Sequence, residues 1–379
     1  MPAARRAPDQ RGIIMAGTNS PTRPVSILCL DGDGIGPEIT AATRRVLQAV
    51  DARWHLGLVF TSHEIGFGAL AKTGSTFPPA VIEAAKQADG ILIGPVSTND
   101  YPAPADGGVN PSGTLRKTLD LYANIRPAKS FPGLPPRVGN AIDLVIAREN
   151  TEGFYADRSM FMGSGEFMPT EDLAVSVRKI TRKASTRIAE TAFELASQRR
   201  RKVTVVHKAN VFRVSDGLFL SAVRAVRDKY PDIDYEEQII DAMAALLIRQ
   251  PDAYDVIVTT NMYGDILSDE ASEIAGSLGL AASLNAGDEF AMAQAQHGSA
   301  PDIAGMDRAN PASLIGSAAM LLRWLGKRRG AADFIAAGDS IDAAIAAMVA
   351  LPETRTADLG GLLGTTAFTD GLIARLGQP

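Results

Sequence analysis

Short apolar runs alternate with longer amphipathic stretches from residue 25 almost to the end of the chain. The apolar runs, which are rich in valine, isoleucine and leucine, predict strands at residues 25–30, 57–61, 90–93, 143–147, 203–206 and 256–259. Apolar residues at helical spacing predict helices at residues 38–50, 173–198, 216–229 and 311–325. Strands that alternate with helices are typical of an α/β fold with a largely parallel sheet, which is the fold class that we predict.

The chain has 379 residues, enough for about two domains. Residues 1–24 carry four arginines and no apolar run of the kind found in signal peptides, so we expect a disordered tail. We expect a large domain from residues 25–121 and 276–379, with a smaller domain inserted at 122–275. Glycine- and proline-rich stretches at 94–113 and 132–140 predict loops.

Composition and charge exclude several classes of protein. The chain has 38 basic and 43 acidic residues, so its net charge of −5 lacks the basic footprint of a nucleic-acid-binding protein. Basic clusters at 199–202 and 327–329 are interpreted as solvated helix ends. No apolar run reaches the roughly 18 residues of a membrane span. A single cysteine, Cys29, excludes internal disulfides and favours a reducing compartment, the cytoplasm.

The glycine-rich segment after the first predicted strand has the sequence DGDGIGPE at residues 31–38. Its glycines follow the spacing G-x-G-x-G, whereas a dinucleotide-binding turn has G-x-G-x-x-G. Pro37 would also remove an amide from the helix terminus that should bind the pyrophosphate. We therefore interpret the segment as a tight connection with Pro37 in the first helical turn.

Two aspartates, Asp265 and Asp269, stand four residues apart just after an apolar run. If Asp265 opens a helix, both carboxylates lie on one face of it. Hard oxygen ligands of this kind suit Mg²⁺ or Mn²⁺, and a third acidic ligand would come from elsewhere. Acids that merely complement the helix dipole are the alternative.

Basic residues near the centre of the chain are candidates for substrate binding. Arginine binds carboxylates in a bidentate manner, so Arg116, Arg126 and Arg148 together would bind an acid with several carboxylates. Alternatively, each of these arginines could form an ordinary salt bridge at the surface. Lys208 directly follows a predicted strand, where proximity to a metal could lower its pKa and let it accept a proton. Tyr155 is the remaining chemical candidate.

Six motifs occur in a fixed order: GDGIGPE at 32–38, TLRK at 114–117 leading to Arg126, RENTEG at 148–153, HKAN at 207–210, NMYGDILSD at 261–269 and HGSAPDIAG at 297–305. This set closely resembles the β-decarboxylating dehydrogenases, the isocitrate and 3-isopropylmalate dehydrogenase family, which also holds homoisocitrate and tartrate dehydrogenases. The resemblance extends from about residue 25 to the segment 355–361.

The resemblance implies the two-domain fold of that family, with a largely parallel sheet in the large domain. It implies oxidation of a 3-substituted malate at C2 and loss of the C3 carboxylate as carbon dioxide. It assigns the three arginines to the carboxylates of this small-molecule substrate. It assigns the divalent metal, Mg²⁺ or Mn²⁺, to Asp241, Asp265 and Asp269.

The resemblance also implies a homodimer with shared active sites. Lys208 and Asp241 would reach the site of the neighbouring subunit. Lys208 would take the proton of the substrate hydroxyl, and Tyr155 would return a proton to C3. Asn210 would orient either the substrate or Lys208.

The cofactor site implied by the resemblance follows the last motif. Its residues would be His297, Gly298, Ser299, Ala300, Pro301, Asp302 and Ile303, with Asn310 beside the adenine. Asp302 would bind the ribose hydroxyls and repel a 2′-phosphate, which favours NAD over NADP. Relatives that use NADP carry lysine and tyrosine at positions 302 and 303. Gln294 stands where many relatives have a glutamate near the nicotinamide.

The group on C3 should contact Asn110 and Ser112. Isopropylmalate enzymes carry a pair of leucines at positions 112 and 113, so the polar residues here favour an isocitrate-like substrate. Residues 99–107 form a loop that is longer than usual, and Tyr101 or Val109 could supply an apolar wall. 3-Isopropylmalate, homoisocitrate and tartrate therefore stay open as alternatives.

A non-catalytic regulatory subunit is the alternative from another class of protein. Such a subunit usually loses several of the chemical residues, whereas this chain keeps Tyr155, Lys208 and the three aspartates. The sequence therefore favours an enzyme, a decarboxylating dehydrogenase that uses NAD.

Overall fold

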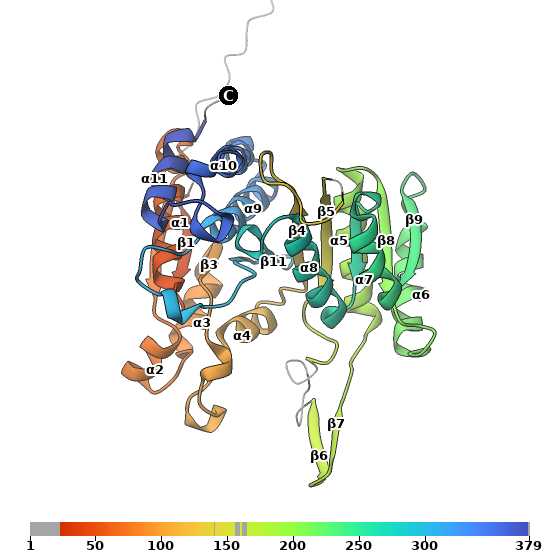
Figure 1. Cartoon of the computed structure of the whole chain (residues 1–379). Helices are drawn as coiled ribbons and strands as arrows, with labels where there is room; N and C mark the ends of the chain where they lie inside the picture. The colour runs from red at the N-terminus through yellow and green to blue at the C-terminus, as the bar shows by residue number, and fades with distance from the viewer. Residues whose placement is uncertain (1–22, 140, 156–159, 161–164, 378–379) are drawn as a thin grey trace, which may run out of the picture.

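A single ten-stranded sheet runs through the molecule, with strand order β2-β1-β3-β12-β11-β4-β5-β10-β8-β9 (Figure 1). The computed structural model describes residues 23–377 except 140, 156–159 and 161–164, so nearly all of the tail predicted at 1–24 lies outside the described residues. The strands of the sheet are β1 Val25–Leu30, β2 Leu58–His63, β3 Gly90–Ile93, β4 Ala123–Lys129, β5 Asp143–Glu149, β8 Lys202–His207, β9 Asp234–Ile239, β10 Val256–Thr259, β11 Leu284–Ala286 and β12 Ala291–Gln294.

The sheet has a parallel part at each end and an antiparallel middle. Strands β2, β1, β3 and β12 pair in parallel, as do β5, β10, β8 and β9. In the middle, β11 is antiparallel to β12 and β4, and β4 is antiparallel to β5. The predicted fold class is confirmed. The strands β4, β5, β8, β9 and β10 all come from residues 122–275, but the predicted domain boundaries themselves stay a prediction.

Helices cover both faces of the sheet (Figure 1). They are α1 Gly36–Trp54, α2 Phe67–Thr73, α3 Pro79–Gln87, α4 Pro111–Thr118, α5 Arg182–Ser197, α6 Ser215–Arg227, α7 Ile240–Arg249, α8 Asn261–Ala275, α9 Ala312–Arg329, α10 Ala332–Ala350 and α11 Thr365–Arg375. None of these helices, or any other in the described residues, is long and apolar enough to span a membrane.

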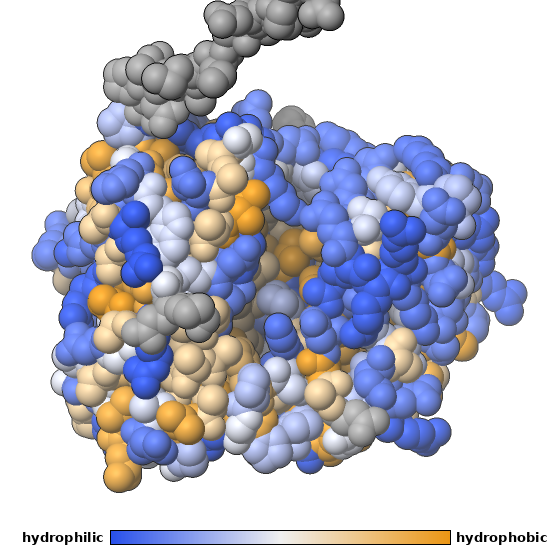
Figure 2. All heavy atoms as spheres, turned by 90° about the horizontal axis from the view of Figure 1, so that it is seen from above, coloured by the Kyte–Doolittle hydropathy of each residue, from blue (hydrophilic) through white to orange (hydrophobic). Residues whose placement is uncertain are grey.

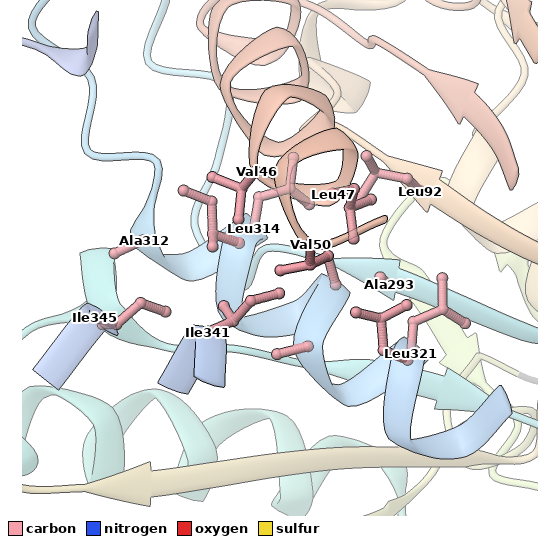
Figure 3. Close-up of a cluster of buried hydrophobic side chains, with 14 of the residues drawn as sticks. Val46, Leu47, Val50, Leu92, Ala293, Ala312, Leu314, Leu321, Ile341 and Ile345 are labelled. Carbon is pink, nitrogen blue, oxygen red and sulfur yellow. The ribbon is translucent and has the colours of Figure 1, made fainter. Parts of the chain in front are cut away.

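Alternate residues of the buried strands point into different cores. Ile27 and Cys29 of β1 pack with α1, α9 and α10, whereas Leu28 and Leu30 pack with α3 and α4. Figure 3 shows Val46, Leu47 and Val50 of α1 facing Leu314 and Leu321 of α9 and Ile341 and Ile345 of α10. At the other end of the sheet, α5 and α6 cover one face and α7 and α8 cover the other. Both faces of the parallel strands are covered by helices. Their residues are therefore apolar on both faces, which explains the continuous apolar runs in the sequence.

Two helices begin at a different residue from the one that the sequence suggested. The helix predicted at 173–198 begins only at Arg182, because Thr181 accepts a hydrogen bond from the amide of Ala184 at 3.2 Å and caps it there. Leu173–Ser176 instead forms β7, which pairs with β6 (Glu166–Thr170) in a hairpin that projects from the body (Figure 1). Helix α8 begins at Asn261, not at Asp265, so Asp265 lies one turn inside the helix.

The two basic clusters, residues 199–202 and 327–329, lie in different environments. Residues 327–329 form the last turn of α9, as predicted. In the other cluster, Arg199 is not a solvated helix end: its guanidinium pairs with Asp143 at 2.7 Å and with buried Asp255 at 2.8 Å. These ion pairs attach the end of α5 to β5 and to the start of β10. The interpretation of residues 199–202 as a purely solvated face was therefore wrong.

Candidate active site

The molecule is hollowed between its two lobes, as Figure 2 shows from above. A cavity of about 780 Å³ is lined by residues 127–136 of β4 and the following loop, by the end of α8, and by α9 and α10. The lining includes none of the predicted site residues. The chemistry predicted from the sequence therefore lies elsewhere, at the start of α8 and at the strands beside it.

Arg148 lies on β5 and is almost fully buried. Its guanidinium donates to the side-chain oxygen of Asn261 at 2.6 and 3.2 Å and forms an ion pair with Asp265. Helix α8 can pack this closely because residue 264 is a glycine: a Cβ there would lie 2.6 Å from the Cγ of Arg148. A glycine at position 264 thus brings the first predicted metal ligand into contact with the predicted substrate arginine.

Arg126 lies on β4, next to β5, and is also buried. Its Nη1 lies 3.1 Å from Asp265 and 3.3 Å from Asp269, and it donates to the Oγ of Ser268 at 2.6 Å. Burial, together with the nearby guanidinium of Arg148, lowers the pKa of Arg126 to about 10. The structure therefore brings two of the predicted arginines and two of the predicted aspartates into one charged cluster.

The pKa values of the two aspartates of the cluster are shifted in opposite directions. Burial by itself would raise the pKa of Asp265, but Arg148, Arg126 and Arg116 outweigh burial and hold that pKa below its ordinary value. For Asp269, burial prevails over the attraction of Arg126, and the pKa is raised. Asp265 is therefore the more firmly ionised of the two oxygen ligands.

The three predicted metal ligands do not form one group within the described residues of a single chain. The described residues contain no group of three or more histidine, cysteine, aspartate or glutamate side chains that could hold a metal ion. Asp241 lies in the first turn of α7 and forms an ion pair with Lys208, which follows β8. Asp265 and Asp269 suit a hard cation in ligand type, and a third carboxylate is needed to complete the set.

Tyr155 lies at the charged cluster, whereas Lys208 and Asn210 lie apart from it. The hydroxyl of Tyr155 donates to Asp265 at 3.4 Å. Lys208 contacts Asp241, and Asn210 lies in an exposed turn after β8. Within one chain, Tyr155 therefore contacts the charged cluster and Lys208 does not, and their roles as proton donor and acceptor stay predictions.

Arg116 lies on α4 and donates to the side-chain oxygen of Gln294 at 2.9 Å. Ser112, also on α4 and buried, donates to the same oxygen at 3.0 Å. Asn110 caps α4, because its side-chain oxygen accepts from the amide of Gly113 at 2.9 Å. The contact of Arg116 and Ser112 with Gln294 was not predicted from the sequence, which identified Gln294 only by its position in the motif.

The loop at residues 99–107 does not provide an apolar wall. Tyr101 donates its hydroxyl to buried Asp33, and its ring packs edge-on against Phe67 with centroids 5.1 Å apart. Val109 packs in the core beside α3 and α4, and its carbonyl accepts from Thr76 at 2.6 Å. Asp33 also accepts from the amide of Ser97 at 3.0 Å, which fixes the start of the loop to the glycine-rich turn.

The predicted cofactor loop rests on the glycine-rich turn between β1 and α1. The carbonyl of Ser299 accepts from the amide of Ile35 at 2.8 Å. A Cβ at Gly34, whose φ is +57°, would lie 2.0 Å from that carbonyl. The side chains of Ser299 and Ser97 form a hydrogen bond of 2.7 Å. The predicted tight connection is confirmed, and it supports the loop after β12.

The groups of this loop fit a bound cofactor. The Nε2 of His297 is buried and has no hydrogen-bond partner within the described part of the chain. Burial lowers the pKa of His297, which favours its neutral imidazole. A Cβ at the neighbouring Gly298 would meet no atom within 4 Å, so the backbone is open at that residue. A buried imidazole nitrogen without a partner in the chain can bond a polar ligand group that reaches it.

The remaining cofactor candidates lie in two environments. Asp302 is exposed in a short helical turn, Pro301–Ile303. Asn310 is buried, donates to Asp358 at 3.0 Å and accepts from the amide of Ala312 at 3.0 Å. Its predicted contact with adenine therefore has to share polar groups that already have partners in the chain.

The sequence model of a family described as isocitrate/isopropylmalate dehydrogenase matches residues 26–372. The chain belongs to this family. It is 41% identical over 348 residues to the 3-isopropylmalate dehydrogenase of Sulfurisphaera tokodaii, covering 92% of this chain and 97% of the relative. It is 40% identical over 351 residues to the isocitrate/homoisocitrate dehydrogenase of Thermus thermophilus, covering 92% and 98%.

Solved structures agree with this assignment. The isocitrate dehydrogenase of Methylococcus capsulatus matches with a TM-score of 0.82 and 36% identity, over 93% of this chain and 100% of that one. The dehydrogenase described here is a decarboxylating enzyme that acts on a CH–OH group. Members of its family use NAD or NADP and a divalent metal ion. The relatives are named for different substrates, so the likeness leaves the substrate open.

Proposed function

We propose that this dehydrogenase oxidises and decarboxylates an isocitrate-like 3-substituted malate, with NAD as the hydride acceptor and Mg²⁺ or Mn²⁺ as the metal. The observation that carries the choice of substrate is the polar wall beside Arg116. Buried Ser112 and Gln294 form that wall, and the aromatic ring of Tyr101 is directed to Asp33 instead. A polar or charged group on C3 would be accommodated there better than an isopropyl group, because it could hydrogen-bond to these side chains and an isopropyl group could not.

The substrate's carboxylates would bind the three arginines. Arg126 and Arg148 are buried and held by α8, so their guanidiniums need little reordering when the acid binds. Asn110 and Ser112 lie at the start of α4, ahead of Arg116, and would contact the C3 substituent. Asn210 would orient the substrate or the base from the neighbouring subunit.

Asp265 and Asp269 would hold the metal together with the partner subunit's Asp241. A divalent ion bound there would lower the pKa of the substrate hydroxyl and stabilise the charge left by decarboxylation. The partner subunit's Lys208 would accept the hydroxyl proton, and Tyr155 would return a proton to C3. The hydrogen bond between Tyr155 and Asp265 supports the placement of the tyrosine beside the reacting carbon.

NAD would bind along the loop after β12. The residues that we assign to it are His297, Gly298, Ser299, Ala300, Pro301, Asp302, Ile303 and Asn310. The exposed carboxylate of Asp302 would accept hydrogen bonds from the ribose hydroxyls and repel a 2′-phosphate. The buried Nε2 of His297 supports a polar contact of the cofactor at the beginning of the loop.

A homodimer with shared sites is part of this proposal. Exposed apolar side chains lie near Lys208 and on the helices that carry Asp241 and Asp265. Val211 and Val214 follow Lys208, Ile248 lies on α7 and Ile266 lies on α8. The projecting hairpin β6–β7 adds Phe167, Met168 and Leu173, which are all exposed. Exposed apolar side chains on these elements support the proposed interface.

Two coarser expectations accompany the proposal. We assign residues 25–121 and 276–379 to a large cofactor-binding domain and residues 122–275 to a smaller domain for substrate, metal and dimerisation. The single cysteine, Cys29, is buried, and burial raises the pKa of its thiol to about 11. A chain without disulfides supports a reducing compartment, which we propose is the cytoplasm.

The absorbance of NADH tests the proposed function directly. Purified enzyme with Mn²⁺ would be assayed with isocitrate, 3-isopropylmalate, homoisocitrate and tartrate. We expect isocitrate to have a higher kcat/KM than 3-isopropylmalate. A preference of at least about tenfold for 3-isopropylmalate would contradict the choice of substrate and favour that alternative, whose namesake relative is 41% identical. Ligand binding without turnover of any acid would favour a regulatory subunit.

A further inference from the structure

Arg178 follows strand β7 at the base of the projecting hairpin, and its side chain is only 8% exposed. Its guanidinium forms an ion pair with Asp216, which is fully buried in the first turn of α6. Replacing a buried ion pair by apolar residues is often neutral or stabilising. The pair is therefore explained better by the geometry that it fixes than by a contribution to stability.

Asp216 connects this ion pair to Lys208. One carboxylate oxygen of Asp216 pairs with Arg178, and the other accepts a hydrogen bond from the backbone amide of Lys208 at 2.5 Å. Its carboxylate thereby closes the turn that leads from β8 to α6. Because the ion pair fixes the orientation of the carboxylate, the position of the Lys208 backbone depends on Arg178.

Arg178 is itself held by helix α8, which carries two of the proposed metal ligands. Its Nη2 donates to the Oγ1 of Thr260 at 3.1 Å. Thr260 is the N-cap residue of α8, but its hydroxyl accepts from Arg178 rather than from an amide of the helix. The ring of Tyr263, also on α8, lies 5.2 Å from the guanidinium carbon, within the range of a cation–π contact. Arg178 thus joins the start of α8 to the turn that carries Lys208.

Two further aromatic rings lie around the guanidinium of Arg178. Phe212, in the turn after Lys208, has its centroid 5.2 Å from the guanidinium carbon. Phe154, the residue before Tyr155, has its centroid 5.9 Å away. Arg178 therefore contacts neighbours of both residues to which we assign proton transfer. A planar guanidinium can stack on rings and donate in fixed directions at the same time, which suits it to hold several segments together.

We propose that Arg178 is a positioning residue, which acts through Asp216 to hold Lys208 in place for the active site of the neighbouring subunit. The inference rests on the proposed function, in which Lys208 accepts the hydroxyl proton in a site completed by the other subunit. Arg178 uses α8 of its own subunit as the support. A proton acceptor works only within hydrogen-bonding distance, so a displaced Lys208 slows the chemical step more than it weakens substrate binding.

The first test is Arg178→Gln, assayed with the acid that the wild type turns over fastest. We expect kcat to fall at least about tenfold, while KM for the acid and the concentration of Mn²⁺ needed for activity change less than about threefold. Arg182→Gln is the matched control, because Arg182 is an exposed arginine that also donates to α6, to Ser221 at 3.4 Å. Its kcat should equal that of the wild type, and thermal unfolding shows whether each variant folds. A loss confined to KM, or an equal loss in the control, would overturn the proposal.

Hybrid dimers show which site Arg178 serves. A Tyr155→Phe chain paired with a Lys208→Met chain contains one intact site, to which the first chain contributes Lys208 and the second contributes Tyr155. Arg178→Gln on the chain that contributes Lys208 should lower the recovered activity at least about tenfold. The same substitution on the chain that contributes Tyr155 should lower it less than about threefold. Equal losses from the two placements would reject the proposal, because they would mark a general effect on the fold.

The hybrids also separate this inference from the proposed function. If they recover no activity even without Arg178→Gln, the shared site is wrong, and the role of Arg178 toward the neighbouring subunit is rejected with it. If they recover activity, the shared site holds, and equal losses then reject only the role of Arg178. If Arg178→Gln does not fold, Thr260→Val removes only the link to α8. On the chain that contributes Lys208, that substitution must lower the recovered activity at least about threefold.

Discussion

Two groups of charged side chains lie near neighbouring strands of the sheet, and they differ in how far the chain itself surrounds them. In the first group, Arg148 and Arg126 are only 2% and 7% exposed, and helix α8 contacts both. In the second group, Asp241 is 69% exposed, and Lys208 contacts it from the turn after β8. The first group is thus enclosed by its own chain, whereas the second faces outward.

The buried and the exposed ion pairs contribute differently to the stability of the fold. Removing one member of a buried ion pair costs roughly 3–5 kcal/mol, because a charge is left uncompensated. An exposed ion pair contributes little to stability. The exposed pair of Lys208 and Asp241 therefore contributes little to folding, and in the proposed dimer it would serve the second subunit.

The largest expected effect comes from breaking the enclosed group at its metal ligand. Asp265→Asn should abolish turnover and weaken the binding of Mn²⁺, because one anionic oxygen ligand is lost. Activity titrated against Mn²⁺ measures this. Glu270→Gln is the control on the same helix, and it should keep near-normal activity. Full activity of Asp265→Asn at ordinary metal concentrations would contradict the metal assignment.

The outward-facing group can be tested by complementation between subunits. Lys208→Met and Tyr155→Phe should each be inactive as homodimers. After subunit exchange, each hybrid dimer would contain one intact site, so an equimolar mixture should recover about a quarter of the wild-type activity. Exchange would be verified with differently tagged chains. No recovery despite exchange would show that each subunit contains a complete site.

The cofactor loop should respond to a double substitution. Asp302→Lys combined with Ile303→Tyr should shift the ratio of kcat/KM for NADP over NAD by about a hundredfold, because a repulsive carboxylate is replaced by a phosphate partner. Asp302→Asn alone removes the charge without adding a partner and should shift the ratio less. A wild type that already prefers NADP would contradict the assignment of Asp302.

A smaller effect is expected at the apolar surface of α8. Ile266, which is 56% exposed, would become buried in the proposed dimer. Ile266→Asp should raise the dimer dissociation constant by about tenfold or more, measured by sedimentation at a series of concentrations. Val59→Asp is the control, because Val59 is 48% exposed on the edge strand β2 at the opposite end of the sheet. Equal effects of both substitutions would argue against an interface at α8.

Several elements were predictable from the sequence because their local pattern and their tertiary environment agree. Strands β1, β3 and β10 begin and end where their apolar runs do, since strands covered on both faces need apolar residues throughout. The motifs identified the family, and the spacing of Asp265 and Asp269 correctly predicted a shared helical face.

Other elements were missed because their partners are remote in the sequence. Strand β4 carries Asn124, Arg126 and Pro127, which do not resemble a buried strand. It can be buried because Asn285 accepts from Asn124 and Ser268 accepts from Arg126, both from other elements. Helix α10 is rich in alanine and apolar over most of its surface, so its sequence lacks a clear helical period.

The sequence by itself determined the fold class, the family and most of the chemical groups, because strand patterns and motif order are local properties. The tertiary structure decided which of those groups meet. Arg126, Arg148 and Asp265 converge because β4, β5 and the helix after β10 are neighbours in space. Gln294 reaches Arg116 from a strand 178 residues away. Such contacts depend on the order of strands in the sheet, which no local pattern contains.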